Sequence, residues 1–288
     1  MSKLHEKSMF VHLSISMWKG RKLDKKTSDE VARRKNASND AGRYYKRLVN
    51  APELKEIERI SNEARQVTYH WTLPWLDGGV RIIPNAKLLD YMNAMSKHKD
   101  DMREQVEKFL RNYPEYVADG AKHLGDMFNP KEYPTVKQLR RRFEFDITLQ
   151  HIADDSDFRV EGAVNPMEKM EQSIRIDVWQ RIDDTMQRLI KQLTNTNNGA
   201  FVRASVCNAV QDLGEIIPQL NLTDDPEVHK IMNAVKKNLN NLDYKALNAD
   251  DDFREKVAEK VRPLAEKSRK MLEDLGVEPE EADQSEAA

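Results

Sequence analysis

The clearest candidate for a binding site is a short run in which cations flank aromatic rings: Arg43, Tyr44, Tyr45, Lys46 and Arg47. Proteins bind single-stranded nucleic acid with this combination, because bases stack on the rings while cations follow the phosphates. The run ends a basic segment, residues 19–47, in which eleven Lys and Arg residues, Arg33 and Arg34 among them, face four acidic residues. This excess predicts salt-dependent binding of single-stranded nucleic acid. The alternative is a solvated helix face whose charge answers an acidic C-terminus.

The C-terminal segment carries that opposite charge. From Glu273 onward it has seven Asp and Glu residues and no Lys or Arg. Such a composition predicts a disordered tail over residues 276–288. Most tails of this kind only keep a protein in solution. The alternative is that this one recruits a partner or competes with a ligand of the basic segment, and its deletion would then raise the affinity for nucleic acid.

A second candidate site is the aromatic loop at residues 71–84, which holds two tryptophans, two prolines and a Gly-Gly turn. Prolines and paired glycines exclude a continuous helix, and a short strand is expected at residues 80–83. Trp71, Trp75 and Arg81 are the candidate residues for docking a protein partner through an apolar patch. The alternative is that the tryptophans pack into the domain that the loop crosses.

Patterns typical of catalytic or cofactor sites do not occur in the sequence. The seven histidines show no HxxxH or HxxE spacing, and no glycine-rich phosphate loop or nucleophile motif is present. The acidic turn at residues 154–157 lacks the ligand spacing of a calcium loop. Cys207 is the only cysteine, so a thiolate zinc site is excluded and a small buried residue is expected. We expect no enzyme activity, metal or cofactor; the alternative is that scattered carboxylates meet in the folded chain.

The totals favour a cytoplasmic protein. The formal net charge is −2, with 39% hydrophobic and 33% charged residues. No apolar run approaches the ~20 residues that a membrane helix needs. The N-terminus lacks the pattern of a signal peptide, and a single cysteine suits a reducing compartment.

Two segments alternate apolar and polar residues, which predicts strands: Val11 to Met17 and Phe143 to Leu149. A third short strand is predicted at residues 158–160. Because these segments are far apart in the sequence, they are expected to pair across the intervening helices in a small sheet.

Helical spacing accounts for most of the remaining chain. A long helix is predicted from Asn85, and Pro114 is predicted to stop or restart it. From Pro166 the chain is predicted to be wholly helical, beginning with an apolar stripe over residues 167–193. A further helix from Phe201 is predicted to end at Pro218.

The predicted fold is therefore mainly α: a helical bundle or long helical hairpin with a small N-terminal α+β part of two or three strands. Three parts are expected: a mixed part over residues 1–163, a helical part over 164–275 and the acidic tail over 276–288. Since the apolar residues form long, narrow stripes, a homo-oligomer is expected. With no catalytic motif, a non-enzymatic interaction protein is the leading hypothesis for the function, and a single-stranded nucleic-acid-binding protein is the alternative.

The loop sequence Trp71-x-Leu-Pro-Trp75-x-Asp-x-Gly-x-Arg81-Ile-Ile-Pro84, followed by Asp157-Phe-Arg-Val160 and a helical C-terminal half, resembles a family of uncharacterised proteins from phages and conjugative elements. Members of that family are encoded beside a MoxR-type AAA+ ATPase and a CobT-like protein with a von Willebrand A domain. The resemblance implies a mobile-element protein that partners an AAA+ ATPase or a von Willebrand A protein. It implies no catalytic residues.

Overall fold

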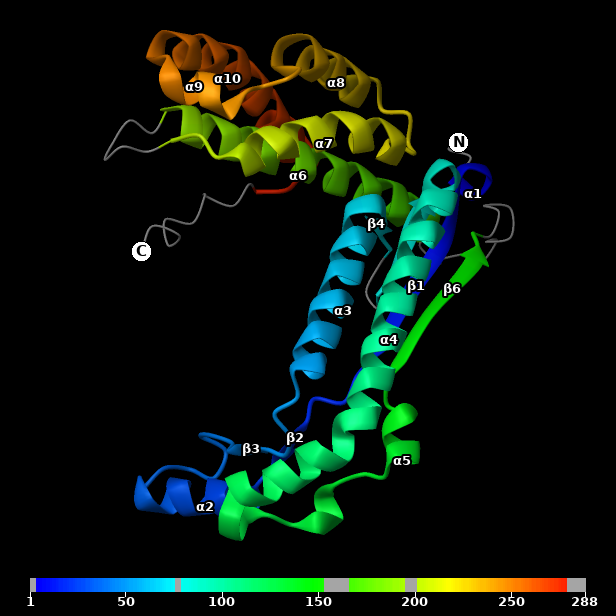
Figure 1. The fold of residues 1–288 in the computed structure, drawn as a ribbon. Helices are drawn as coiled ribbons and strands as arrows, with labels where there is room; N and C mark the ends of the chain where they lie inside the picture. Colours follow the sequence, from blue (N-terminus) through cyan, green and yellow to red (C-terminus); the bar gives the residue numbers. More distant parts are fainter. Residues whose placement is uncertain (1–3, 76–78, 153–165, 195–200, 279–288) are drawn as a thin grey trace. The chain divides into compact units, whose positions relative to one another are not determined.

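The computed structural model describes residues 4–75, 79–152, 166–194 and 201–278 (Figure 1). Most of this chain is helical, and a small sheet includes the N-terminal strand. The chain divides into two compact units. Unit 1 comprises residues 1–12, 71–89 and 149–288, and unit 2 comprises residues 13–70 and 90–148. The predicted fold class, mainly α with a small α+β part, is confirmed, whereas the bundle or hairpin arrangement stays a prediction.

The larger sheet has the strand order β4-β5-β1-β6. Its strands are β1 (Ser8–Ser16), β4 (Leu73–Pro74), β5 (Val80–Pro84) and β6 (Glu144–His151). β1 pairs antiparallel with β5, with Ser8 opposite Pro84 and His12 opposite Val80. β1 and β6 include all but one residue of each of the two segments in which alternation predicts strands, Met17 and Phe143 lying just outside them, and they pair with segments distant in sequence as expected.

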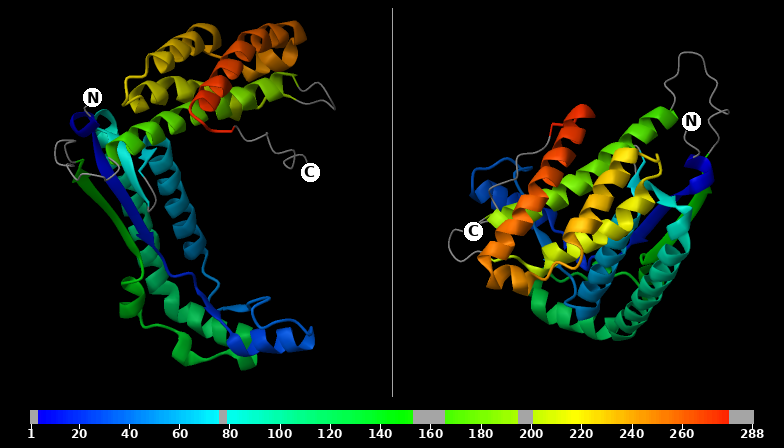
Figure 2. Two further views of the ribbon diagram at one scale, coloured as in Figure 1. Left: turned by 180° about the vertical axis from the view of Figure 1, so that it is seen from behind. Right: turned by 90° about the horizontal axis from the view of Figure 1, so that it is seen from above.

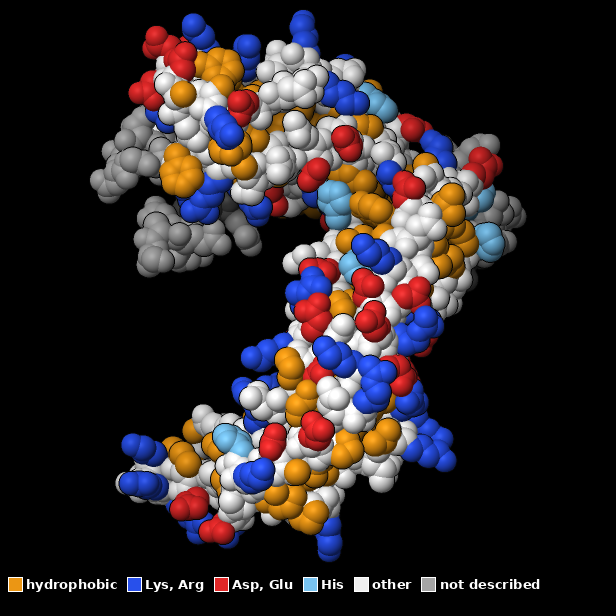
Figure 3. Space-filling view, viewed as in Figure 1, with side chains coloured by type: hydrophobic (Ala, Val, Ile, Leu, Met, Phe, Trp, Pro, Cys, Tyr) orange, Lys and Arg blue, Asp and Glu red, His pale blue; other side chains and the backbone are white. Residues whose placement is uncertain are grey.

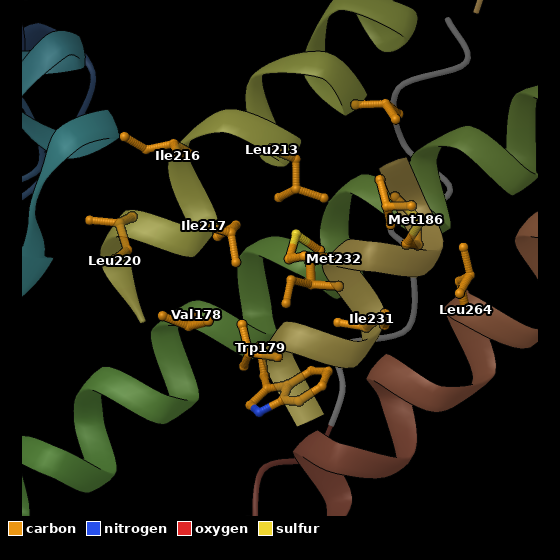
Figure 4. Close-up of a cluster of buried hydrophobic side chains, with 14 of the residues drawn as sticks. Val178, Trp179, Met186, Leu213, Ile216, Ile217, Leu220, Ile231, Met232 and Leu264 are labelled. Carbon is orange, nitrogen blue, oxygen red and sulfur yellow. The ribbon is translucent and has the colours of Figure 1, made fainter. Parts of the chain in front are cut away.

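The helices of unit 1 surround one apolar core. A short helix α1 (Leu4–Lys7) begins the unit, and the others are α6 (Pro166–Thr194), α7 (Ala204–Leu220), α8 (Pro226–Leu239), α9 (Tyr244–Ala249) and α10 (Asp251–Asp274). α6 contacts α7 and α10, and Figure 2 shows α10 beside α6. Figure 4 shows Trp179 of α6, Leu213 of α7 and Met232 of α8 converging in this core. The apolar stripe predicted over residues 167–193 is therefore buried within the chain.

Unit 2 contains most of two long helices, α3 (Pro52–Trp71) and α4 (Asn85–Leu124), which run side by side (Figures 1 and 2). Thr68 and Tyr91 link them through a hydrogen bond of 3.1 Å between their hydroxyl groups. The shorter elements of the unit are β2 (Arg21–Leu23), α2 (Lys25–Arg34), β3 (Tyr45–Arg47), η1 (Gly125–Met127), η2 (Pro130–Glu132) and α5 (Val136–Arg140).

Pro114 does not stop α4, contrary to the sequence prediction. The helix continues through the proline to Leu124 and is bent in its C-terminal half (Figure 1). A proline inside a helix costs about 3 kcal/mol, because it removes a hydrogen bond and crowds the preceding turn. Phe109, Leu110 and Tyr113 are buried just before it, and each buried side chain of this size contributes roughly 1.5–3 kcal/mol. Pro218 likewise lies inside α7, two residues before its end.

The described residues contain six strands rather than the predicted two or three. The additional strands β2, β3 and β4 have three, three and two residues. Strands of two or three residues are too short to show a recognisable alternation of apolar and polar residues. The strand predicted at residues 158–160, the expected boundary at residue 163 and the last ten residues of the acidic tail lie outside the described residues. No helix in the described part of the chain is long and apolar enough to cross a membrane.

Candidate nucleic-acid interface

The basic segment folds into a two-stranded ribbon, β2–β3, together with helix α2. The ribbon is antiparallel, with Arg21 opposite Arg47, Lys22 opposite Lys46, and Leu23 opposite Tyr45. Gly20 fixes its start, because its φ of 63° favours glycine and its carbonyl accepts a hydrogen bond of 2.8 Å from the Leu48 amide. A Cβ at this position would lie 2.9 Å from the side chain of Leu54, so a larger residue would displace the strand from α3.

At the other end of β2, Asp24 connects the ribbon to α2. Its carboxylate accepts a hydrogen bond from the Thr27 amide and caps α2, and its own amide donates to the Tyr44 carbonyl at 2.9 Å. By residue type Thr27, Ser28 and Asp29 are candidate caps, but they lie inside α2, and the N-cap is Asp24. α2 ends at Arg34, where helix-forming residues give way to the loop over residues 35–44.

One face of the ribbon gathers cations around an aromatic ring. Opposed residues of an antiparallel pair point to the same side, so Arg21, Tyr45 and Arg47 share a face. The Arg21 guanidinium carbon lies 5.3 Å from the centroid of the Tyr45 ring, which is a cation–π contact. Tyr45 is 46% exposed. Like charges directly opposite one another are destabilising, so an anion placed between Arg21 and Arg47 would stabilise this face.

A cavity of about 370 Å³ opens between this face and α3. Lys19, Arg21, Tyr45, Arg47 and Lys55 line it, and Glu58 is its one acidic lining residue. Glu58 pairs with Lys19 at 2.7 Å, and hydrogen bonding and attraction from Lys19, aided by the charge of Arg21, lower the pKa of Glu58. Within the described residues, no carboxylate forms an ion pair with Arg21, Arg47 or Lys55. The cavity is therefore cationic and has a ring at its wall.

Lys46 points away from this face and is 5% exposed. Its ammonium lies 2.8 Å from Glu132 of η2 and 3.4 Å from Asp24, and it donates to the Met127 carbonyl at 2.9 Å. Burial alone would lower the pKa of Lys46, but hydrogen bonds and attraction from Glu132 and Asp24 raise it above its ordinary value. Lys46 therefore fixes the ribbon to the segment that follows α4.

Tyr44 and Arg43 line a separate cavity of about 350 Å³ between α2 and the following loop. Tyr44 is 42% exposed, and its amide donates to the Ser28 hydroxyl at 2.9 Å. Figure 3 shows Lys and Arg side chains, with acidic ones beside them, over α2. Arg33 and Arg34 are exposed on this helix but line neither cavity. The five-residue run thus contributes lining residues to two separate cavities, and its lysine forms a buried ion pair.

Three further residues join the predicted ones at the ribbon cavity. Lys19 and Arg21 lie in the basic segment, whose charge was the signal for the site. Lys55 comes from α3, outside that segment, and only the folded structure brings it to the cavity. A cation on the exposed face of a helix carries no sequence signal of its own.

The model of a family described as "Protein of unknown function (DUF3150)" matches residues 6–266. The chain belongs to this family. The match includes every residue of the two cavities. Comparison with curated proteins and with solved structures gave no match.

The second candidate site of this DUF3150 chain, the aromatic loop, uses its rings for packing. The Trp75 ring centroid lies 4.8 Å from that of Phe10, and both tryptophans are partly buried against the core of unit 1. The Lys87 ammonium lies 5.7 Å from the centroid of the Trp71 ring. Arg81 donates to the hydroxyl and the carbonyl of Thr72 at 2.6 and 3.1 Å. This geometry favours the packing interpretation, and docking through these residues stays a prediction.

The remaining unusual groups of the DUF3150 chain are buried. Among the described residues, no group of three or more His, Cys, Asp or Glu could hold a metal ion. Cys207 is buried as predicted, and burial, aided by the charge of Asp243, raises the pKa of its thiol. Burial also raises the pKa of Asp177 despite the Arg181 guanidinium 2.7 Å away. Arg181 in turn donates to the Thr72 carbonyl at 2.7 Å, so this pair ties α6 to the start of β4.

Proposed function

We propose that this DUF3150 protein binds single-stranded nucleic acid through the open face of the β2–β3 ribbon. The observation that carries the proposal is the direct opposition of Arg21 and Arg47 on the face that exposes Tyr45. Phosphates of the strand lie between the two guanidinium groups, and a base stacks on the ring. Lys55 extends the cationic surface along the cavity.

The proposal specifies a single strand because the exposed ring requires an accessible base face. In a duplex the faces of the bases are stacked on one another, whereas in a single strand each face is available to an aromatic side chain. A free anion would use the arginines but not Tyr45. If Arg21, Arg47 and Lys55 neutralise about three phosphates, the slope of log affinity against log salt is about −2.

A charge-reversal experiment tests this function. The full chain is titrated with a labelled oligothymidine about ten nucleotides long, and fluorescence anisotropy is read between about 50 mM and about 200 mM salt. The Arg21→Glu/Arg47→Glu variant is expected to lose at least about 100-fold in affinity. Equal affinity of this variant and the unaltered chain would overturn the proposal.

The matched control reverses two cations that lie outside the ribbon. Arg103 of α4 forms an exposed pair with Asp100, and Lys122 of the same helix forms one with Asp119. The Arg103→Glu/Lys122→Glu variant has the same net charge as the ribbon variant. It is expected to retain nearly all of the affinity, because its two cations lie outside the ribbon. A nonspecific charge effect would instead lower the affinity of both variants alike. Circular dichroism checks that both variants are folded.

Docking of a protein partner, such as an AAA+ ATPase or a von Willebrand A protein, remains a proposal from the resemblance. An origin in a phage or other mobile element is proposed from the same resemblance, whereas self-association is proposed from the long apolar stripes of the sequence. Co-purification from a native host and light scattering on the isolated chain test these proposals. If the isolated chain is a monomer and recovers no partner, the proposals of self-association and partner docking are wrong. This result does not bear on the origin in a mobile element.

A further inference from the structure

The cavity beside the ribbon, between α2 and the loop that follows it, is not used by the proposed function. Its wall is mainly apolar and is formed by Val31, Ala32, Ala37, Ala41 and Tyr44. Its volume of about 350 Å³ is at the lower end for small-molecule sites, which are roughly 300–1,000 Å³. Small side chains leave it open, and Val31 exposes 51% of its surface at its edge.

The loop that closes this cavity has a defined backbone structure. The Ala37 amide donates to the Ala32 carbonyl at 2.9 Å, and the Ala41 amide donates to the Ser38 carbonyl at 3.0 Å. The Tyr44 amide is held by Ser28 of α2. These bonds attach both ends of the loop to the helix, so the cavity is a feature of the fold.

The charges around the cavity indicate what it accepts. Lys35 and Arg43 belong to its lining, and within the described residues neither forms an ion pair with a carboxylate. An apolar wall with an aromatic ring suits a flat, weakly polar group, and the flanking cations suit an anion attached to that group. A nucleotide unit combines these two chemistries. An apolar side chain of a protein would use the wall but leave the cations without a partner.

The backbone connects this cavity to the ribbon. Tyr44 and Tyr45 are consecutive residues, and each lines one of the two cavities. The two cavities therefore adjoin at this step of the backbone, and a bound strand that spans the step can place different bases against the two rings. The cations Arg43 and Arg47 lie on either side of the tyrosine pair in the sequence.

We infer that the α2 cavity is a nucleobase pocket: one base of the strand held on the ribbon inserts between Val31 and Tyr44, with its phosphate against Arg43 and Lys35. This inference rests on the proposed function and names a second contact with the same ligand. It predicts that affinity depends on a base, and not only on the phosphate chain, at this position.

The test fills the pocket without changing its charge. Ala41→Phe occupies the cavity, Tyr44→Ala removes the ring, and Tyr44→Phe keeps it. With the oligothymidine, the first two variants are expected to bind about tenfold more weakly, and Tyr44→Phe is expected to bind as the unaltered chain does. With a strand of the same length made only of abasic units, all four proteins are expected to bind equally.

The outcomes separate this inference from the proposed function. If Ala41→Phe and Tyr44→Ala bind oligothymidine normally while the Arg21→Glu/Arg47→Glu variant does not, the pocket is not used and the ribbon proposal stands. An equal loss on both strands would show that the variants disturb the phosphate contacts, which also overturns the base pocket. If the unaltered chain binds neither strand, the proposed function itself fails.

A photochemical measurement gives the position directly. A strand with one 5-bromouracil is bound to the full chain and irradiated, and mass spectrometry locates the cross-link. A cross-link at Tyr44 supports the pocket. Cross-links confined to Tyr45 would contradict it, because they would place every accessible base on the ribbon face.

Discussion

The β2–β3 ribbon and the β4–β5 pair are built from the same kinds of residue but present them differently. In the β4–β5 pair, Trp75 lies against Phe10, and Arg81 donates twice to Thr72. In the ribbon, Tyr45 is exposed, and the guanidinium group of Arg21 contacts its ring. Rings and cations that pack into the fold stabilise it, whereas an exposed ring and cation that contact each other at the surface are still available to a ligand. Composition alone does not distinguish the two cases.

The largest expected effect is the difference in stability between variants of two adjacent cations of β3. Lys46→Ala leaves the carboxylates of Asp24 and Glu132 without their shared cation, and breaking a buried pair of this kind costs about 3 kcal/mol. Arg47→Ala removes an exposed cation that opposes Arg21, so the free energy of unfolding should change by less than about 0.5 kcal/mol. Urea denaturation of both variants measures this difference. Equal destabilisation would show that the two faces of the ribbon are not distinct.

Replacing one aromatic residue in each region by alanine tests the comparison. Trp75→Ala is expected to reduce the free energy of unfolding by about 2 kcal/mol, because a partly buried ring and its contact with Phe10 are lost. Tyr45→Ala is expected to change stability by less than about 0.5 kcal/mol. The same substitution should lower oligothymidine affinity about tenfold, since a stacking ring is lost. If Tyr45→Ala instead lowers the free energy of unfolding and leaves the affinity unchanged, the ring is structural.

Measuring the stability of the chain as a function of pH tests the buried ring of Tyr113. Tyr113 contacts the rings of Trp18 and Phe109 in unit 2, and burial raises its pKa to about 12. The unfolded chain loses this proton near the ordinary tyrosine pKa of about 10. The contribution to stability is therefore fully present below pH ~10 and is lost as the pH rises toward ~12. Tyr113→Phe should flatten this part of the stability profile, as measured by urea denaturation at each pH.

The control for that titration is Tyr45→Phe, which removes a hydroxyl at the exposed face. Tyr113→Phe also removes a buried hydroxyl that has no hydrogen-bond partner within the described residues, so it should not destabilise the chain near neutral pH. A loss of more than about 1 kcal/mol there would reveal a hydrogen bond to that hydroxyl.

How much of the fold and the site can be predicted from the residues depends on element length and on three-dimensional proximity. β1 and β6 have nine and eight residues, so their alternation was recognisable, whereas three-residue strands such as β2 carry no such pattern. The run from Arg43 to Arg47 marked this segment as unusual, but it did not indicate that Lys46 turns inward. That orientation depends on Glu132, which is 86 positions further along the chain. Lys55 was unpredictable for the same reason.

Deleting the acidic tail should have the smallest effect on oligothymidine affinity. This deletion tests whether the exposed cations of the ribbon also attract acidic residues of this chain. Residues 279–288 contain four acidic side chains and no basic one. The deletion should begin after Glu278, because Val277 packs against the core and its amide donates to the Leu272 carbonyl at 3.0 Å. Removing the tail is expected to raise oligothymidine affinity about threefold near 50 mM salt, and the gain should vanish near 200 mM because exposed charges are screened. A tail in which the four acidic residues are replaced by Gln and Asn should give the same gain. If the neutral tail behaves like the natural one, the tail does not compete for the ribbon.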